Sequence, residues 1–240
     1  MGTGLTQSWA VEEQVGRAAD LFSAESWLDV VAPTVRVLKV SAPTIVLGSS
    51  QSLDVVELAD CAAGGVDVVR RRSGGGAVWL DDDMVWVDVF VPVGHARWDA
   101  DIGRSMWWLG QAWAEALHEV GVADVVVHRD AMVRTRWSSL VCFAGLGAGE
   151  VTLDGRKIVG ISQRRSRAGA LFQCGVLRRW HPDRLVDALA GLDQLDRVAL
   201  RRVVADAGVG IGDRAALALR AFLRALATGV TSVTPNLSDR

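Results

Sequence analysis

The chain has 240 residues, half of them hydrophobic, which is enough to bury a substantial core and excludes a chain that is disordered as a whole. Its net charge of -2 and pI of about 6.1 exclude a global basic field, so we expect no nucleic-acid partner. The sequence shows no basic leader, no apolar run that could cross a membrane and no CxxC spacing among its three cysteines. We therefore expect a cytoplasmic protein without membrane contact or bound metal.

The first part of the chain predicts one helix followed by five strands. Residues 8–23 place apolar side chains at roughly helical spacing and predict an amphipathic helix. Runs rich in β-branched residues, bounded by Pro, Gly and Ser, then predict strands at 34–40, 44–47, 66–71, 77–80 and 84–93. The turn Asp81-Asp82-Asp83 between the last two strands predicts a β-hairpin, and its acids are explained by a polar turn rather than by a cation site.

The second part returns to helical spacing over residues 101–119, where Gly121 is placed to end the helix. Asp154-Gly155 is a two-residue hairpin signal. Short runs predict further strands at 125–128, 140–143, 150–153, 156–162 and 170–177, before a helical pattern from Pro182 to about Thr228. This order predicts an α/β (α+β) fold in which a mixed β-sheet is flanked by helices.

The sharpest local feature is the sequence RRRSGGGAVW at residues 70–79, between two predicted strands. Three successive glycines permit positive φ and let backbone amides approach a ligand oxygen. Arg71 or Arg72 offers paired N–H donors to a carboxylate or phosphate, and Ser73 adds a hydroxyl. No Lys-Ser/Thr pair or helix follows, as a phosphate-binding or dinucleotide-binding loop would require. The segment therefore predicts an anion-binding loop, with a flexible connection as the alternative.

Lys157 is the second feature, because it follows the predicted turn at the start of a strand. Of the 26 basic residues, only Lys39 and Lys157 are lysines. A lysine kept in a chain that otherwise uses arginine marks a place for a compact, titratable ammonium. The alternative is an ordinary solvated charge on a strand.

Together the two segments resemble the lipoate-protein ligase A and octanoyltransferase family. The motif at Arg71–Val78 is followed about 80 residues later by GRKIVG at Gly155–Gly160, and the similarity runs from about Thr34 to Leu177 and includes PTIVLGSSQ at Pro43–Gln51. The resemblance implies the fold that this family shares with biotin-protein ligases. The implied organisation is a catalytic domain at residues 1–182, a short helical C-terminal segment of the same domain at 183–228 and a disordered tail at 229–240.

The resemblance also implies roles for individual residues. The glycine-rich strand pair would line the acyl pocket, and Lys157 would hold the reacting carbonyl or acyl-adenylate. Leu80 and Cys174 depart from the family pattern, which often has histidine at both positions. The implied acyl-binding or adenylate-binding residues are Arg71, Ser73, Gly74, Gly75, Gly76, Ala77, Val78, Gly160, Cys174 and Gly175.

Cys142 is the third feature and lies fifteen positions before Lys157. This arrangement resembles the octanoyltransferase branch that works through a cysteine. The resemblance implies that Cys142 is the acyl acceptor and that Lys157 favours its thiolate form. An apolar-strand cysteine is otherwise inert core, and that alternative stays open for both Cys142 and Cys174.

Three functions fit these features. The favoured one is transfer of an octanoyl or lipoyl group from acyl-carrier protein to a lysine of a lipoyl-domain protein through a Cys142 thioester, without a cofactor. The second is an ATP-dependent ligase that uses ATP and Mg with lipoate or octanoate to form an acyl-adenylate. The third is a non-catalytic binder of an acyl group or adenylate. A biotin-protein ligase fits the motifs less well.

Overall fold

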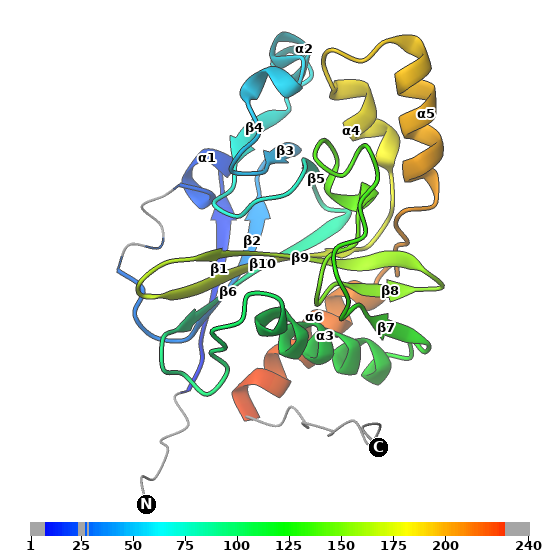
Figure 1. Cartoon of the computed structure of the whole chain (residues 1–240). Coiled ribbons are helices and arrows are strands. Elements are labelled where there is room, and N and C mark those ends of the chain that lie inside the picture. The colour runs from blue at the N-terminus through cyan, green and yellow to red at the C-terminus, as the bar shows by residue number, and fades with distance from the viewer. Residues whose placement is uncertain (1–7, 24–26, 28, 229–240) are drawn as a thin grey trace, which may run out of the picture.

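Two β-sheets form the centre of the molecule (Figure 1), which is a computed structural model that describes residues 8–23, 27 and 29–228. The larger sheet is antiparallel except for the parallel pair β1–β2. Its strand order is β1 (Ala10–Gly16), β2 (Thr34–Val40), β6 (Met84–Pro92), β10 (Gly169–Leu177), β9 (Arg156–Arg165), β8 (Val151–Leu153) and β7 (Val125–Val127). The smaller sheet has the order β4 (Asp67–Arg70), β3 (Thr44–Leu47) and β5 (Val78–Leu80).

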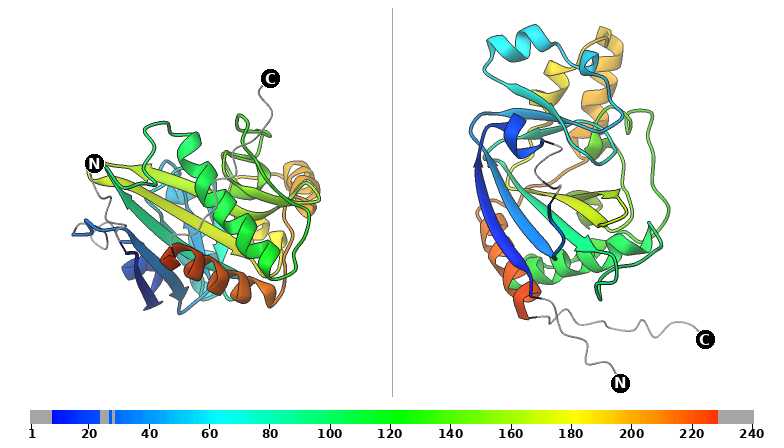
Figure 2. Two further views of the ribbon diagram at one scale, coloured as in Figure 1. Left: turned by 90° about the horizontal axis from the view of Figure 1, so that it is seen from below. Right: turned by 90° about the vertical axis from the view of Figure 1, so that its left-hand side faces the viewer.

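Helices α3 (Trp107–Glu119) and α6 (Arg214–Thr228) lie side by side across one face of the large sheet (Figure 2). The rings of Trp113 and Phe222 stack between them with centroids 4.0 Å apart, and both side chains are fully buried. Alternate residues of the strands, among them Val87 and Val89 of β6, point into this layer. This face of the sheet is therefore covered by an apolar core.

The opposite side of the large sheet carries the small sheet and the remaining helices (Figure 1). These are α1 (Ala18–Leu21), α2 (Leu58–Ala63), α4 (Pro182–Ala188) and α5 (Gln194–Ala205), with the short 3-10 helices η2 (Leu53–Val55) and η4 (Cys142–Ala144). A third 3-10 helix, η3 (Arg104–Met106), leads directly into α3. Ile45 and Leu47 of β3 pack against Leu185 of α4 and Leu200 of α5 in a second apolar cluster. The C-terminal helices are thus divided between the two sides of the molecule.

Most predicted elements are confirmed. The predicted strands at 34–40, 44–47, 66–71, 84–93 and 170–177 form with ends shifted by at most one residue, and the helix predicted at 101–119 forms as η3 and α3. Asp154 and Gly155, with φ of 50° and 75°, make the predicted tight turn between β8 and β9. The mixed sheet flanked by helices is therefore the predicted fold class.

Three local predictions are wrong. Residues 8–23 form a strand and the short helix α1, because β1 pairs with β2 along its whole length at the sheet edge and this pairing outweighs the helical spacing. The run at 140–143 forms η4 instead of a strand, after one isolated bridge between Ala77 and Val141. Strands β5 and β6 are not a hairpin, since β5 pairs with β3 whereas β6 pairs with β2 and β10.

After α5 the chain returns to the large sheet beside Lys157. The Lys157 amide donates to the Ala207 carbonyl and the Val209 amide donates to the Lys157 carbonyl, each at 2.9 Å. The residues between α5 and α6 thus add a short parallel bridge to β9. None of the described helices has the length and apolar character needed to span a membrane. The predicted tail at 229–240 lies outside the described residues.

Candidate active site

The glycine-rich loop is fixed between the end of β3 and η4. Gly75 has a φ of +103°, and the glycine at position 48 lets the Gly75 carbonyl approach so closely that a Cβ there would lie 1.9 Å from its oxygen. The Ser49 amide donates to the Ser73 carbonyl at 2.9 Å, and the Cys142 amide donates to the Ala77 carbonyl at 3.0 Å. The loop is therefore a fixed part of the fold and not the flexible connection that remained as an alternative.

Arg71 lies beneath this loop and is only 2% exposed. Its Nη2 donates to the carbonyls of Gly74 at 2.8 Å and Gly76 at 3.1 Å, and its Nε donates to Ser73 Oγ at 3.1 Å. The same Nη2 is 3.9 Å from the sulfur of Cys142. Much of the predicted anion-binding capacity of Arg71 is thus used to hold the loop, while one edge of the guanidinium faces the cysteine.

Ser73 connects Arg71 to a chain of buried polar groups. Its hydroxyl is 2.7 Å from Gln173 Oε1 and 2.8 Å from Ser162 Oγ. The Gln173 amide nitrogen is 3.3 Å from both carboxylate oxygens of Asp88, which is 1% exposed. Burial raises the pKa of Asp88 to about 7, although hydrogen bonds from Trp86 and Gln173 oppose this rise. A polar relay therefore runs from the middle of the large sheet to the loop.

Cys142 and Lys157 meet at the other side of the loop. Cys142 is half-buried at the start of η4, and Lys157, 3% exposed, donates from Nζ to the Cys142 carbonyl at 3.1 Å. The same ammonium is 2.7 Å from the Glu150 carboxylate, which is 4% exposed. Glu150 also accepts from the amides of Gly147 and Ile161, at 2.6 and 3.2 Å. Lys157 is therefore held in a buried ion pair and is not the solvated charge that remained as an alternative.

These groups open onto a cleft with a volume of about 600 Å³. Its polar wall comprises Gly74, Gly75, Gly76, Cys142, Glu150, Lys157 and Ser162. Its apolar wall includes Met106, Trp107 and Ile161, and the loop at 129–132 forms part of its rim. The arrangement combines a thiol, a cation and apolar surface, which suits the carbonyl and the chain of an acyl group.

The remaining sequence-predicted residues are divided between this site and the core. Gly160 and Gly175 are cross-strand partners and line a small hollow behind Cys142, together with Val78. The side chain of Ala77 is fully buried, and its backbone pairs with η4. Cys174 was predicted to contact the acyl group or adenylate, but it does not line the cleft. Strand alternation turns its side chain into the core beneath α3, where it is fully buried. Burial raises the pKa of the Cys174 thiol well above its usual value, which fits an inert core cysteine.

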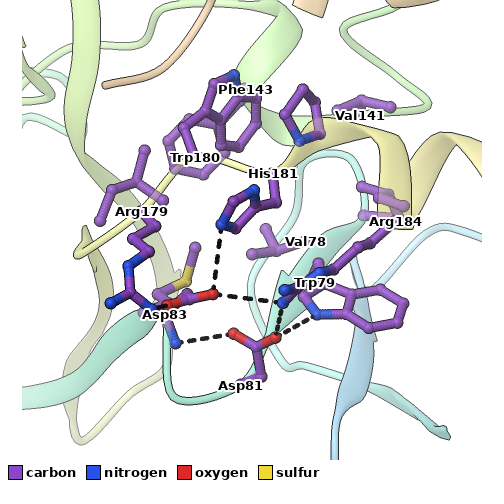
Figure 3. A pocket seen from close by; sticks show the side chains of 15 residues that line it. Val78, Trp79, Asp81, Asp83, Val141, Phe143, Arg179, Trp180, His181 and Arg184 are labelled. Atoms are coloured by element: carbon purple, nitrogen blue, oxygen red, sulfur yellow. Dashed lines mark hydrogen bonds and ion pairs between the residues drawn. The ribbon is translucent and has the colours of Figure 1, made fainter. Parts of the chain in front are cut away.

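A second, largely apolar pocket is lined by Val141 and Phe143, the two neighbours of Cys142 in the chain (Figure 3). Asp81 and Asp83 line it and form ion pairs with Arg184 at the start of α4. Asp83 also pairs with Arg179 at 3.2 Å. The three-aspartate turn therefore fastens the C-terminal segment to the corner between β5 and β6, and the described residues hold no group of acids, cysteines and histidines suited to a metal.

Sequence reasoning missed Glu150, Gln173, Ser162 and Asp88. An acid before a short strand is typical of a solvated turn, so Glu150 gave no signal by itself. Asp88 and Gln173 did give a signal, since each is a polar residue inside a strongly apolar run. Their pairing depends on the register of β6 and β10, which places Gln173 opposite Asp88.

The family model of the lipoyl protein ligase A/B catalytic domain matches residues 6–209. An octanoyltransferase LipM from Moorella thermoacetica is 34% identical over 144 residues, which are 60% of this chain and 52% of that protein. An octanoyltransferase LipM from Kyrpidia tusciae is 29% identical over 189 residues, which are 77% of this chain and 69% of that protein. The match to the Moorella protein thus spans about half of its length.

Solved structures show the same fold. A bi-partite lipoate protein ligase from Thermoplasma acidophilum superposes with a TM-score of 0.71 at 16% identity, covering 94% of this chain and 85% of that chain. A lipoate-protein ligase A bound with ATP superposes with a TM-score of 0.58 at 18% identity, covering 91% and 94%. At these identities the likeness concerns the fold.

Proposed function

The chain belongs to the lipoyl protein ligase A/B family, and from this premise we propose that it transfers an octanoyl or lipoyl group to a lysine of a lipoyl domain through a thioester on Cys142. One observation carries the proposal. The Cys142 thiol lies on the cleft wall where the glycine loop and the Lys157–Glu150 pair meet. An inert core cysteine would not require an open cleft, a glycine-rich loop and a buried ion pair around it.

The transfer divides into two exchanges that balance without water or ATP. In the first, the Cys142 sulfur attacks the carbonyl carbon of an acyl-carrier thioester, the carrier C–S bond breaks, and the carrier leaves as a thiol with the cysteine proton. In the second, the acceptor lysine nitrogen attacks the enzyme thioester, an amide forms, and the proton lost by the amine returns to the Cys142 sulfur. The enzyme ends in its starting state, so this route needs no cofactor.

The surrounding groups fit these steps. Lys157 Nζ holds the Cys142 carbonyl and lies at the cleft surface, where its charge can stabilise the oxygen of a tetrahedral intermediate. The apolar wall at Met106, Trp107 and Ile161 suits an alkyl chain. The relatives named octanoyltransferase LipM support transfer of an octanoyl group. Acyl-carrier protein as donor and a lipoyl-domain protein as acceptor complete the proposal.

Intact-protein mass spectrometry tests the route. After incubation with octanoyl-carrier protein, the chain should gain one octanoyl group that hydroxylamine removes and that a lipoyl domain accepts. Cys142→Ser should gain none, whereas the matched control Cys61→Ala, at a buried cysteine outside the cleft, should still be acylated. If Cys142→Ser keeps full activity with lipoate, ATP and Mg, the thioester route is wrong and the ATP-dependent ligase is the function. Ligand binding without either activity identifies a non-catalytic binder.

A further inference from the structure

Two buried cations lie beside Cys142, and they differ in how their charge is compensated. The Lys157 ammonium is 2.7 Å from Glu150, so this pair carries no net charge, and its contact with the cysteine is to the carbonyl. Arg71, by contrast, donates only to carbonyl, hydroxyl and sulfur groups among the described residues. The uncompensated positive charge next to the Cys142 sulfur therefore belongs to Arg71.

We propose that Arg71 is a cation that stabilises the Cys142 thiolate, and that Gln173 is the positioning residue that orients it. This inference rests on the proposed role of Cys142 as nucleophile. Attraction between opposite charges strengthens in a water-poor site, and a cation near a cysteine enlarges its thiolate fraction. The Arg71 Nη2 lies 3.9 Å from the sulfur, within reach of such an interaction.

The donor and acceptor roles along the polar relay explain how the Arg71 guanidinium is oriented. Asp88 accepts from the Gln173 amide nitrogen, which turns Gln173 Oε1 toward Ser73. The Ser73 hydroxyl therefore donates its one hydrogen to Gln173 Oε1 and accepts a hydrogen bond from Arg71 Nε. With Nε fixed at this point, the guanidinium fork projects Nη2 toward Gly76 and the cysteine.

Gly75 keeps the gap between the two groups free of side chains. A Cβ at this position would lie 2.8 Å from Arg71 Nη2 and 3.8 Å from Cys142 Sγ. The glycine in the middle of the loop therefore does more than allow the positive φ of +103°. The missing side chain also leaves the space beside the guanidinium edge and the sulfur unfilled.

The test measures the rate of Cys142 alkylation by iodoacetamide between pH 5 and 10, located by peptide mass spectrometry. Arg71→Met should raise the pH midpoint and lower the rate at pH 7 about tenfold or more, since one pH unit changes the thiolate fraction tenfold. Arg71→Lys, which keeps a charge, should recover part of the rate. Arg164→Met, at an exposed arginine of β9, controls for overall charge.

Gln173→Met is similar in volume and leaves every charge in place, so it tests only the orientation of the Arg71 guanidinium. It should lower the alkylation rate at pH 7 about threefold and move the midpoint in the same direction as Arg71→Met. It also carries the test if Arg71→Met does not fold. Unchanged alkylation in Arg71→Met and Gln173→Met, or a loss in Arg164→Met as large as that of Arg71→Met, overturns the inference. Alkylation does not depend on acyl transfer, so a missing octanoyl adduct in the wild type counts against the proposed function and not against the role of Arg71.

Discussion

The two faces of the large sheet differ in chemistry although the same strands supply both. In β10, Gln173 belongs to the polar relay, whereas Phe172 and Cys174 on either side of it are buried in the α3–α6 core. In β6, Asp88 is likewise flanked by Val87 and Val89 of that core. Because side chains alternate along a strand, neighbouring residues lie on opposite faces, one in the apolar core and the next in the polar relay. Stability and activity should therefore respond to different substitutions.

The largest effect is expected on the apolar face. Phe222→Ala removes a fully buried ring that stacks on Trp113, and should lower the free energy of unfolding by about 3–5 kcal/mol. Acyl transfer per folded molecule should stay close to that of the wild type. Urea denaturation and a transfer assay at 25 °C measure both, with Leu217→Ala, at a half-exposed leucine of α6, as the control. A folded Phe222→Ala protein that has lost transfer would show that the faces are coupled.

On the polar face, Lys157→Arg should reduce acyl transfer at least about 100-fold, which corresponds to about 2.7 kcal/mol of activation free energy. The planar guanidinium does not fit the compact position between Glu150 and the Cys142 carbonyl, although the charge is kept. Lys39→Arg is the matched control, because Lys39 is exposed and pairs only loosely with Asp82. Near-normal turnover in Lys157→Arg would reduce Lys157 to a structural charge.

Asp88→Asn should change how the free energy of unfolding depends on pH, which a substitution on the apolar face should not do. The raised pKa of about 7 means that folded Asp88 keeps its proton while the unfolded carboxyl ionises near its usual 3.8. The contribution of Asp88 to the free energy of unfolding is thus highest at low pH and is lost as pH rises from about 4 to 7. The variant lacks this loss, so it should gain about 2.5 kcal/mol on the wild type between pH 5 and pH 8. Equal stability differences in urea denaturation at pH 5 and pH 8 would contradict the assigned titration.

The smallest effect is expected for Cys174→Ala. It removes one buried sulfur and should lower the free energy of unfolding by about 1 kcal/mol. The octanoyl adduct on Cys142 should form at the wild-type rate, because Cys174 points away from the cleft. A slowed adduct in mass spectrometry would indicate that the core face reaches the site.

Much of the fold was predictable because its central strands carry their own signal. The β-branched runs at 34–40 and 84–93 and the Asp154-Gly155 turn specify their conformation locally. Residues 8–23 and 140–143 do not, because an edge strand and a short 3-10 helix depend on partners far along the chain. The corner between β5 and β6 likewise depends on ion pairs with Arg184, about a hundred residues later.

The site was predictable where a motif is contiguous. The glycine loop, Cys142 and Lys157 each stand in a recognisable string, and the structure brings them together at one cleft. Glu150 and Gln173 matter only through strand register and burial, which no local pattern encodes. Cys174 was misassigned for the same reason, since a shift of one residue along a strand reverses the face.

The bridge between Lys157 and residues 207–209 has a consequence for the order in which the site is completed during synthesis. A nascent chain that has emerged only as far as α4 already contains every residue of the cleft, but the Lys157 backbone still lacks its partners at Ala207 and Val209. The edge of β9 next to Lys157 gains these partners only when residues 207–209 have been made. This part of the site is therefore completed after its sequence motifs.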